Sequence, residues 1–145
     1  MKRRRISKMV TLMLAIALVF LLASSALAAS LTFTASTVYK AFTTTNSMTK
    51  TSSQTWKKWT VTPSSLSHSP NPSSYNYAMA RPVGPSGELY ATAYKVYANQ
   101  TTSYTPNTSG LSANTVKIKI INAYYDNNGR DDIKMSINGS ATGTV

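Results

Sequence analysis

Beyond residue 28, the apolar side chains come in short runs of β-branched and aromatic residues, separated by Pro, Gly and Asn. No segment there shows the sustained apolar spacing of three and four residues, with a cap at each end, that marks an amphipathic helix. Tyr is abundant, with nine copies, whereas Leu66, Leu89 and Leu111 are isolated. Since aromatic and β-branched residues fit strands better than helices, the pattern predicts an all-β fold.

Several short runs have the composition of strands, and the residues between them have the composition of turns. The runs are 31–39, 40–47, 54–62, 74–80, 88–98, 115–126 and 131–138. The Ser/Pro-rich stretch 62–74 is predicted to be a loop, because it contains Pro63, Pro70 and Pro72. Such strands, with no helix to cover a sheet, predict a single small antiparallel β-sandwich over 29–145, with a small β-barrel as the alternative.

The last two runs flank Asn128-Gly129, and Asn-Gly is a strong signal for a tight hairpin. Pairing them around that turn places one set of residues on a common, nearly apolar face: Ile118, Ile120, Asn122, Tyr124, Ile133, Met135 and Ile137. Lysines dominate the opposite face, as a half-buried antiparallel pair requires. Asn122 is the misfit on the apolar face. The sequence therefore predicts that 115–126 and 131–138 form a hairpin.

Residues 1–28 have the three-part layout of a secretory signal peptide. A basic head is followed by an apolar segment from Met9 to Ala23, and Ala26-Leu27-Ala28 offers small residues for cleavage. The apolar segment is about fifteen residues long, shorter than the roughly 20 that a membrane-spanning helix needs. We therefore expect a signal-peptide helix that is removed after Ala28, rather than a retained anchor, and a secreted domain over 29–145.

The charge of that domain is smaller than the total suggests. Five of the 15 basic residues lie in the first 28 residues and all four acidic residues lie beyond them, so the formal charge falls from +11 to +6. A positive balance favours an anionic wall polymer, an acidic glycan or a membrane surface as partner. Nucleic acid fits poorly, because the chain is expected to be exported and has no clustered basic helix.

The residues that carry chemistry are few. There is no Cys, and His68, the single His, lies in the predicted loop, so we expect no catalytic residue, metal or cofactor, and not an enzyme. A glycosidase-like pairing of Glu88 with Asp126 or Asp131 remains an alternative. The segment 126–132 resembles a calcium loop in its oxygen donors. Arg130, however, occupies a ligand position, so a plain turn is favoured.

The most suggestive surface candidate is the motif Trp56-Lys57-Lys58-Trp59. Two Trp around two Lys offer a stacking surface for a sugar and charge for an anionic polymer or lipid headgroup. Strict alternation places Trp56 and Trp59 on opposite faces of a strand, so one is expected in the core and the other exposed or under a loop. The alternative is a strand with a buried Trp and solvated lysines.

In size, export signal and Ser/Thr/Tyr-rich β composition, the chain beyond residue 28 is loosely similar to secreted bacteriocins of the lactococcin 972 type. The similarity covers the class of protein and no individual residues, so it assigns no site. It implies an alternative function, that of a secreted bacteriocin-like antibacterial protein. The residues themselves favour an exported, non-catalytic β-domain that acts at the bacterial cell envelope or outside the cell and binds anionic or glycan surfaces.

Overall fold

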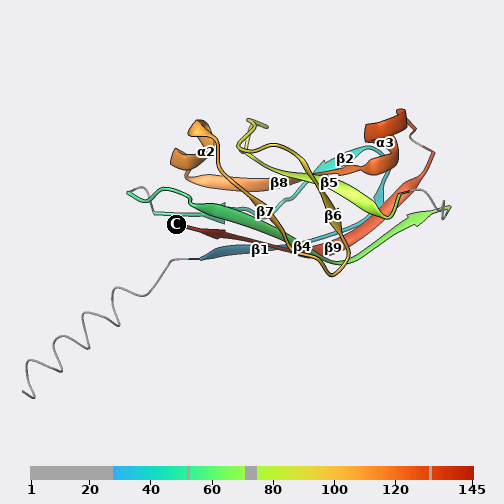
Figure 1. The fold of residues 1–145 in the computed structure, drawn as a ribbon, viewed down its shortest axis with the longest axis horizontal. Coiled ribbons are helices and arrows are strands. Elements are labelled where there is room, and N and C mark those ends of the chain that lie inside the picture. The colour runs from blue at the N-terminus through green and yellow to red at the C-terminus, as the bar shows by residue number, and fades with distance from the viewer. Residues whose placement is uncertain (1–27, 52, 71–74, 131) are drawn as a thin grey trace, which may run out of the picture.

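The structure is a computed structural model that describes residues 28–51, 53–70, 75–130 and 132–145. These residues form two antiparallel sheets that lie one above the other (Figure 1). The prediction of an all-β fold is confirmed. The proposed signal peptide, apart from Ala28, lies outside the described residues.

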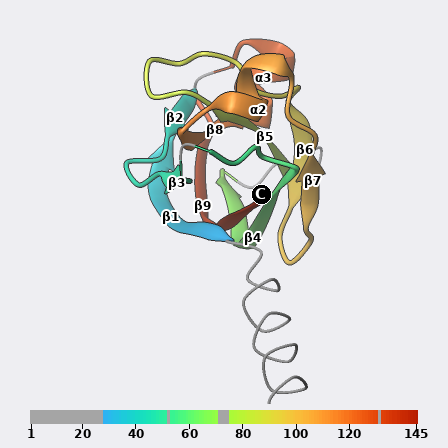
Figure 2. The ribbon, with the colours of Figure 1, turned by 90° about the vertical axis from the view of Figure 1, so that its left-hand side faces the viewer.

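The four-stranded sheet has the order β1-β9-β4-β7, and the five-stranded sheet has the order β2-β8-β5-β6, with β3 also paired to β8. The strands of the first sheet are β1 (Ala29–Val38), β9 (Lys134–Thr144), β4 (Lys58–Ser69) and β7 (Thr102–Tyr104). Those of the second are β2 (Ala41–Thr43), β3 (Met48–Thr49), β8 (Thr115–Asn122), β5 (Tyr77–Val83) and β6 (Tyr94–Tyr97). Two short helices, α2 (Thr108–Ser112) and α3 (Ala123–Asn128), complete the described elements. Seen from the end, β1 and β2 lie on one side of the molecule and β6 and β7 on the other (Figure 2).

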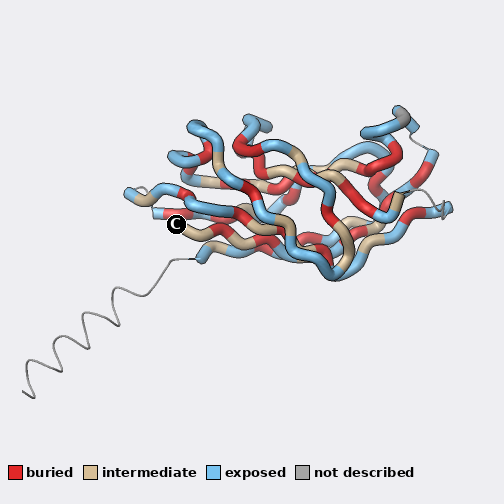
Figure 3. Tube along the Cα trace, in the orientation of Figure 1, coloured by how far each residue is buried: buried red, intermediate tan, exposed pale blue. Residues whose placement is uncertain are grey.

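The core lies between the sheets, and buried residues alternate with less buried ones along the long strands (Figure 3). In β8, Ile118 and Ile120 are fully buried while the lysines between and beside them are half-buried. In β9, Met135 and Ile137 are buried in the same way. The predicted faces of both strands are therefore correct.

The predicted hairpin between those strands is wrong. β8 pairs with β2, β3 and β5, whereas β9 pairs with β1 and β4 in the other sheet. Helix α3 separates the two strands: the Asn122 side chain accepts a hydrogen bond from the Tyr124 N–H at its start, and Gly129 adopts the left-handed conformation at its end, with φ of 64°. A Gly with positive φ suits a helix end as well as a hairpin turn, so the Asn-Gly signal was ambiguous.

The predicted loop over 62–74 is also wrong for much of its length. Strand β4 continues through Pro63 to Ser69, and the rest of the stretch up to residue 74 lies outside the described residues apart from Pro70. The sheet accepts Pro63 because the register with β9 shifts between Pro63 and Ser65. Pro is tolerated at such bulges, where a strand residue need not donate to the ladder.

Candidate functional site

The motif predicted as a binding surface divides into buried and exposed residues. Trp56 and Trp59 are 1% and 0% exposed, so both belong to the core and neither offers a stacking surface. Their rings pack 5.9 Å apart, and the Trp56 indole N–H donates to the Ala113 carbonyl at 2.7 Å. One Trp was expected in the core and the other exposed or under a loop. Neither is exposed, and strand alternation does not reach Trp56 because β4 begins at Lys58.

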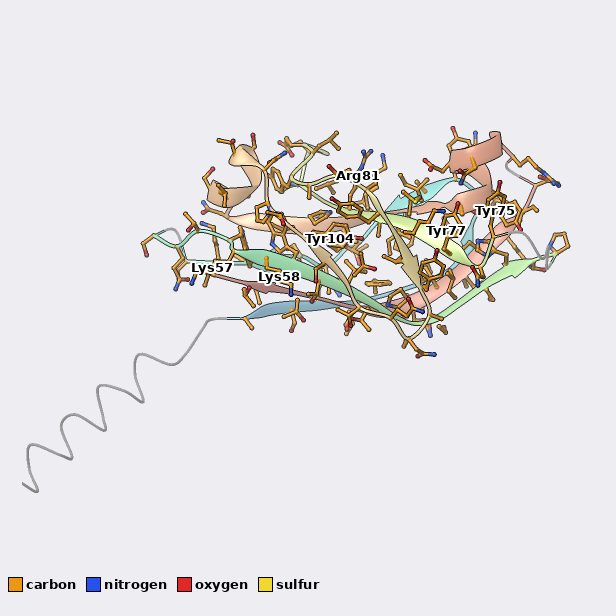
Figure 4. All side chains as sticks on the ribbon, in the orientation of Figure 1. Lys57, Lys58, Tyr75, Tyr77, Arg81 and Tyr104 are labelled. Carbon is orange, nitrogen blue, oxygen red and sulfur yellow. The ribbon has the colours of Figure 1, made fainter. Side chains whose placement is uncertain are left out.

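Lys57 and Lys58 are exposed, as the motif required. They lie at the beginning of β4 in the four-stranded sheet, next to the C-terminal end of β9 (Figure 4). The Lys57 N–H donates to the Thr144 carbonyl, so the backbone there is fixed while both side chains are exposed. They are two exposed cations without the exposed aromatic surface that the flanking Trp residues were expected to provide.

His68 is buried, not exposed in a loop as its Ser/Pro-rich surroundings suggested. It lies on β4, where its ring meets the edge of the Tyr124 ring with the ring centres 5.3 Å apart, and its Nε2 is buried without a hydrogen-bond partner among the described residues. Burial lowers the pKa of His68 below its ordinary value of 6.5, and the influence of the nearby Asn122 side chain opposes that shift only in part. Neither neighbour is an acid, and the geometry of a catalytic base held between a carboxylate and a nucleophile does not arise at this residue.

A second group of cations is brought together on the outer face of the five-stranded sheet. Arg81 on β5 and Lys119 on β8 are direct cross-strand partners, and Lys117 lies two residues along β8, opposite Val83. Lys95 on β6 is the partner of Met79 on β5. Alternation places all four on the side of the sheet that faces away from Ile118 and Ile120. We call the group the basic face, and its members are Arg81, Lys95, Lys117 and Lys119.

Arg81 borders a surface hollow of about 550 Å³. The hollow is lined by Arg81, Leu89, Ala91, Thr92, Ala93, Thr105, Pro106 and Asn107. The Arg81 Nε is buried and has no hydrogen-bond partner, which is unusual for a guanidinium donor. A carboxylate or phosphate seated in the hollow would lie beside the Arg81 side chain, and guanidinium groups bind such anions.

The basic face ends in a group of tyrosines. The Lys95 ammonium lies 4.4 Å from the centre of the Tyr77 ring, and Tyr77 contacts Tyr97 and Tyr75 with ring centres 5.8 and 5.7 Å apart. Tyr77 is buried, while Tyr97 is half-buried. The cation–π contact holds Lys95 against the aromatic group at the end of the face.

None of the described acids occupies a strand position of the basic face, although Glu88 directly precedes Leu89, which bridges Val83 at the end of that face. Glu88 lies in the turn after β5, where its carboxylate accepts from the Ser86 N–H at 3.2 Å. Asp132 pairs with Arg130, which lowers the pKa of the Asp132 carboxyl, and Asp126 is on α3. Among the described residues, no three acidic, His or Cys side chains lie together as metal ligands would, so the 126–132 segment gains no support as a calcium loop. Asp131 lies outside the described residues.

Sequence reasoning missed the basic face because it depends on which strands are neighbours. The alternation in 115–122 did place Lys117 and Lys119 together, but Arg81 lies at the point where two Pro and two Gly suggested irregular structure. Only the β5–β8 register brings Arg81 opposite Lys119.

In the part of the chain that the structure describes, no helix has the length and apolar character needed to cross a membrane. In comparisons with known proteins, the chain matches no family model and no curated sequence.

Proposed function

We propose that this chain is an exported, non-catalytic β-domain that binds anionic polymers or glycans at a bacterial cell envelope through its basic face. The proposal treats the two sheets as a β-sandwich rather than a barrel, because no strand ladder joins them within the described ranges. The leader-like residues 1–28 support export, and the formal charge of +6 beyond them supports an anionic partner.

The observation that carries the proposal is the pairing of Arg81 with Lys119. Like charges directly opposite each other in an antiparallel ladder destabilise a sheet, by up to about 1 kcal/mol for one pair. No described strand position on this face carries an acid to offset the repulsion. Proteins often keep an unfavourable contact of this kind, such as two facing cations with no acid beside them, at a functional site. Bound anionic groups would relieve the repulsion between Arg81 and Lys119.

The hollow beside Arg81 supports a defined mode of binding. Thr92 and Thr105 line it with Arg81, so hydroxyl groups and a guanidinium share the same space. Such a set suits a carboxylate or phosphate that is attached to a sugar or polyol. The anion would pair with Arg81, and the threonine hydroxyls of the protein would form hydrogen bonds with hydroxyl groups of the ligand. Lys117, Lys119 and Lys95 then supply longer-range attraction to adjacent anionic units of the polymer.

The experiment is a binding assay with isolated bacterial cell walls across a salt series, using the exported protein. The double variant Arg81→Gln/Lys119→Gln is expected to weaken binding about tenfold or more. The control Lys57→Gln/Lys58→Gln removes the same charge from the other sheet and is expected to change binding much less. Equal losses in the two variants would contradict a dedicated face and indicate only general attraction. High salt is expected to release the wild-type protein, because about 1 M salt shortens the Debye length to about 3 Å.

Export is tested separately by determining the N-terminal sequence of protein recovered outside the cells. The expected first residue is Ala29. A chain that stays with the cells and keeps its first 28 residues would contradict the export part of the proposal. The export test and the anion-binding assay are independent, so failure of export would not change the outcome expected for binding.

A further inference from the structure

The hollow beside Arg81 has an apolar wall as well as a cation. Half of its lining is apolar, namely Leu89, Ala91, Ala93 and Pro106. Leu89 is 51% exposed, the largest value among the exposed large hydrophobic residues that the structure describes. It bridges Val83, which is the cross-strand partner of Lys117, so Leu89 continues the basic face. An exposed leucine and a guanidinium therefore border the same space, and an anion alone would leave the apolar wall uncovered.

The two segments that form the walls of the hollow are tied together by Asn107. Its side-chain amide donates to the Leu89 carbonyl at 2.7 Å, and its backbone N–H donates to the Tyr90 carbonyl at 2.8 Å. The Asn107 side-chain oxygen also accepts from the Gly110 N–H at 2.8 Å, which fixes it at the start of α2. The hollow is therefore formed before a ligand arrives, and a preformed site binds with little reordering of the protein.

The polar part of the lining is small and specific. Thr92 and Thr105 are exposed, and neither hydroxyl has a hydrogen-bond partner among the described residues. Arg81 is the one charged residue among the described residues that line the hollow. Glu88 lies outside the lining, and its carboxylate accepts from the Ser86 N–H. Sites for small ligands usually combine an apolar lining with a few polar groups of this kind, and a volume of about 550 Å³ is within their usual range.

We propose that the hollow binds a sugar acid whose carboxylate is attached to a carbon that also carries a small apolar group, as in a lactyl ether. The carboxylate pairs with Arg81, and the apolar group packs against Leu89 and Ala93. The sugar hydroxyls form hydrogen bonds with Thr92 and Thr105. This inference rests on the proposed function, because it takes the anionic partner to bind beside Arg81, and it narrows the class of glycan that fits there.

A sugar fits the backbone beside the hollow better than an extended peptide does. Added peptide strands bind mainly through main-chain hydrogen bonds along an exposed sheet edge. Here the Tyr90 N–H already donates to the Pro82 carbonyl, and Tyr94 is already paired with Ala80 in the β5–β6 ladder. Only residues 91–93 lie between these two pairings, which is too short a segment to hold an added strand.

The test is a chemical-shift titration of the exported protein with three matched ligands. N-acetylmuramic acid carries a methyl group beside its carboxylate, glucuronic acid carries a carboxylate without one, and N-acetylglucosamine has the acetylated sugar without a carboxylate. Wild type is expected to bind N-acetylmuramic acid at least about fourfold more tightly than glucuronic acid, which is the effect of burying one methyl group. N-acetylglucosamine is expected to bind more weakly than N-acetylmuramic acid. The shifts are expected at the Leu89 methyl groups and at the amides of Thr92 and Thr105.

Two leucine variants separate the apolar wall from general attraction. Leu89→Gln is expected to bring the ratio of the two affinities close to one while the affinity for glucuronic acid is retained. The matched control is Leu111→Gln, because Leu111 is also exposed, at 40%, but lies on α2 outside the lining. It is expected to keep the wild-type ratio. Both side chains are exposed, so both variants are expected to fold, and far-UV circular dichroism checks this.

Equal affinity of wild type for the two sugar acids, binding of none of the three ligands, or the same ratio in both leucine variants would overturn the inference. Tighter binding of N-acetyl-Ala-Ala than of N-acetylmuramic acid would overturn it in favour of a peptide. The proposed function is decided separately by the cell-wall assay. Weaker wall binding by Arg81→Gln/Lys119→Gln would uphold the basic face even where the sugar preference fails, whereas unchanged wall binding would contradict the basic face itself.

Discussion

Arg81 on β5 and Lys119 on β8 face each other as direct cross-strand partners on the outer side of the five-stranded sheet. Two cations in this position repel each other in the free protein. The pair therefore links a local cost in stability to the proposed ability of the basic face to hold anionic groups.

Replacing Lys119 with Gln is expected to stabilise the free protein by about 0.2 to 1 kcal/mol, because it removes the repulsion with Arg81. The free energy of unfolding is measured by urea denaturation. The control is Lys58→Gln, which removes an exposed lysine whose β9 partner is the uncharged Thr144 and which is expected to change stability by less than about 0.5 kcal/mol. A lower free energy of unfolding for Lys119→Gln than for wild type would contradict the idea that the Arg81–Lys119 pair destabilises the free protein.

Replacing Asn122 with Ala is expected to destabilise the protein by about 3 kcal/mol or more. Asn122 is fully buried; its amide donates to the Val38 and Ile133 carbonyls at 3.0 and 2.7 Å, and its oxygen accepts from the Tyr124 N–H at 3.1 Å. The substitution strands two buried carbonyls and removes a helix cap, each worth about 1 kcal/mol or more.

The exposed Asn138 on β9 provides the comparison for that variant. Urea denaturation of Asn138→Ala is expected to show a change within about 0.5 kcal/mol of wild type. An equally small change for Asn122→Ala would contradict the hydrogen bonds by which the Asn122 side chain connects β8 to β1 and to the residue before β9.

The two buried Trp are expected to differ in how they tolerate Phe. Trp56→Phe loses the indole hydrogen bond to the Ala113 carbonyl, whereas the Trp59 indole N–H has no hydrogen-bond partner. Trp56→Phe is therefore expected to cost about 1 kcal/mol or more beyond Trp59→Phe, since both lose similar ring volume. The measurement is urea denaturation of the two variants. An equal cost, or strong quenching of wild-type Trp fluorescence by iodide, would contradict the burial of this motif.

Stability is expected to fall as the pH drops below about 6.5 because of His68. Burial lowers its folded-state pKa below the ordinary value of 6.5, so the unfolded chain binds the proton more readily than the folded one. This contribution to stability is complete above pH 6.5 and is lost as the pH falls through the lower, folded-state pKa. His68 is the single His in the chain, so denaturation of His68→Gln at several pH values should show a flatter profile between about pH 5 and 7. An unchanged slope would contradict the assignment.

Much of the local structure could be predicted because alternation is a local property. It placed Ile118, Ile120 and Met135 toward the core, and it singled out Asn122 as an exception on an apolar face. The exception has a physical reason that the pattern alone could not supply. Asn122 is buried because three backbone groups, from β1, α3 and the residue before β9, use its side chain.

The pairing of strands was not predictable in the same way. Gly129 has a positive φ, which serves a helix end here and would equally have served a hairpin. Choosing between them requires knowing that β8 and β9 find partners far away in the sequence, such as Met79 for Ile121 and Ala35 for Ile137. The basic face depends on one such distant pairing, so the sequence pattern alone could not indicate it.

The most direct test of the basic face is a chemical-shift titration of the isotopically labelled protein with a soluble anionic glycan or a poly(glycerol phosphate) oligomer. The account predicts that the amides of Arg81, Lys119 and Lys95 shift in a saturable, salt-sensitive way, while those of Lys57 and Lys58 stay nearly unchanged. Shifts confined to the beginning of β4, or no saturable shift with either polymer at low salt, would contradict it.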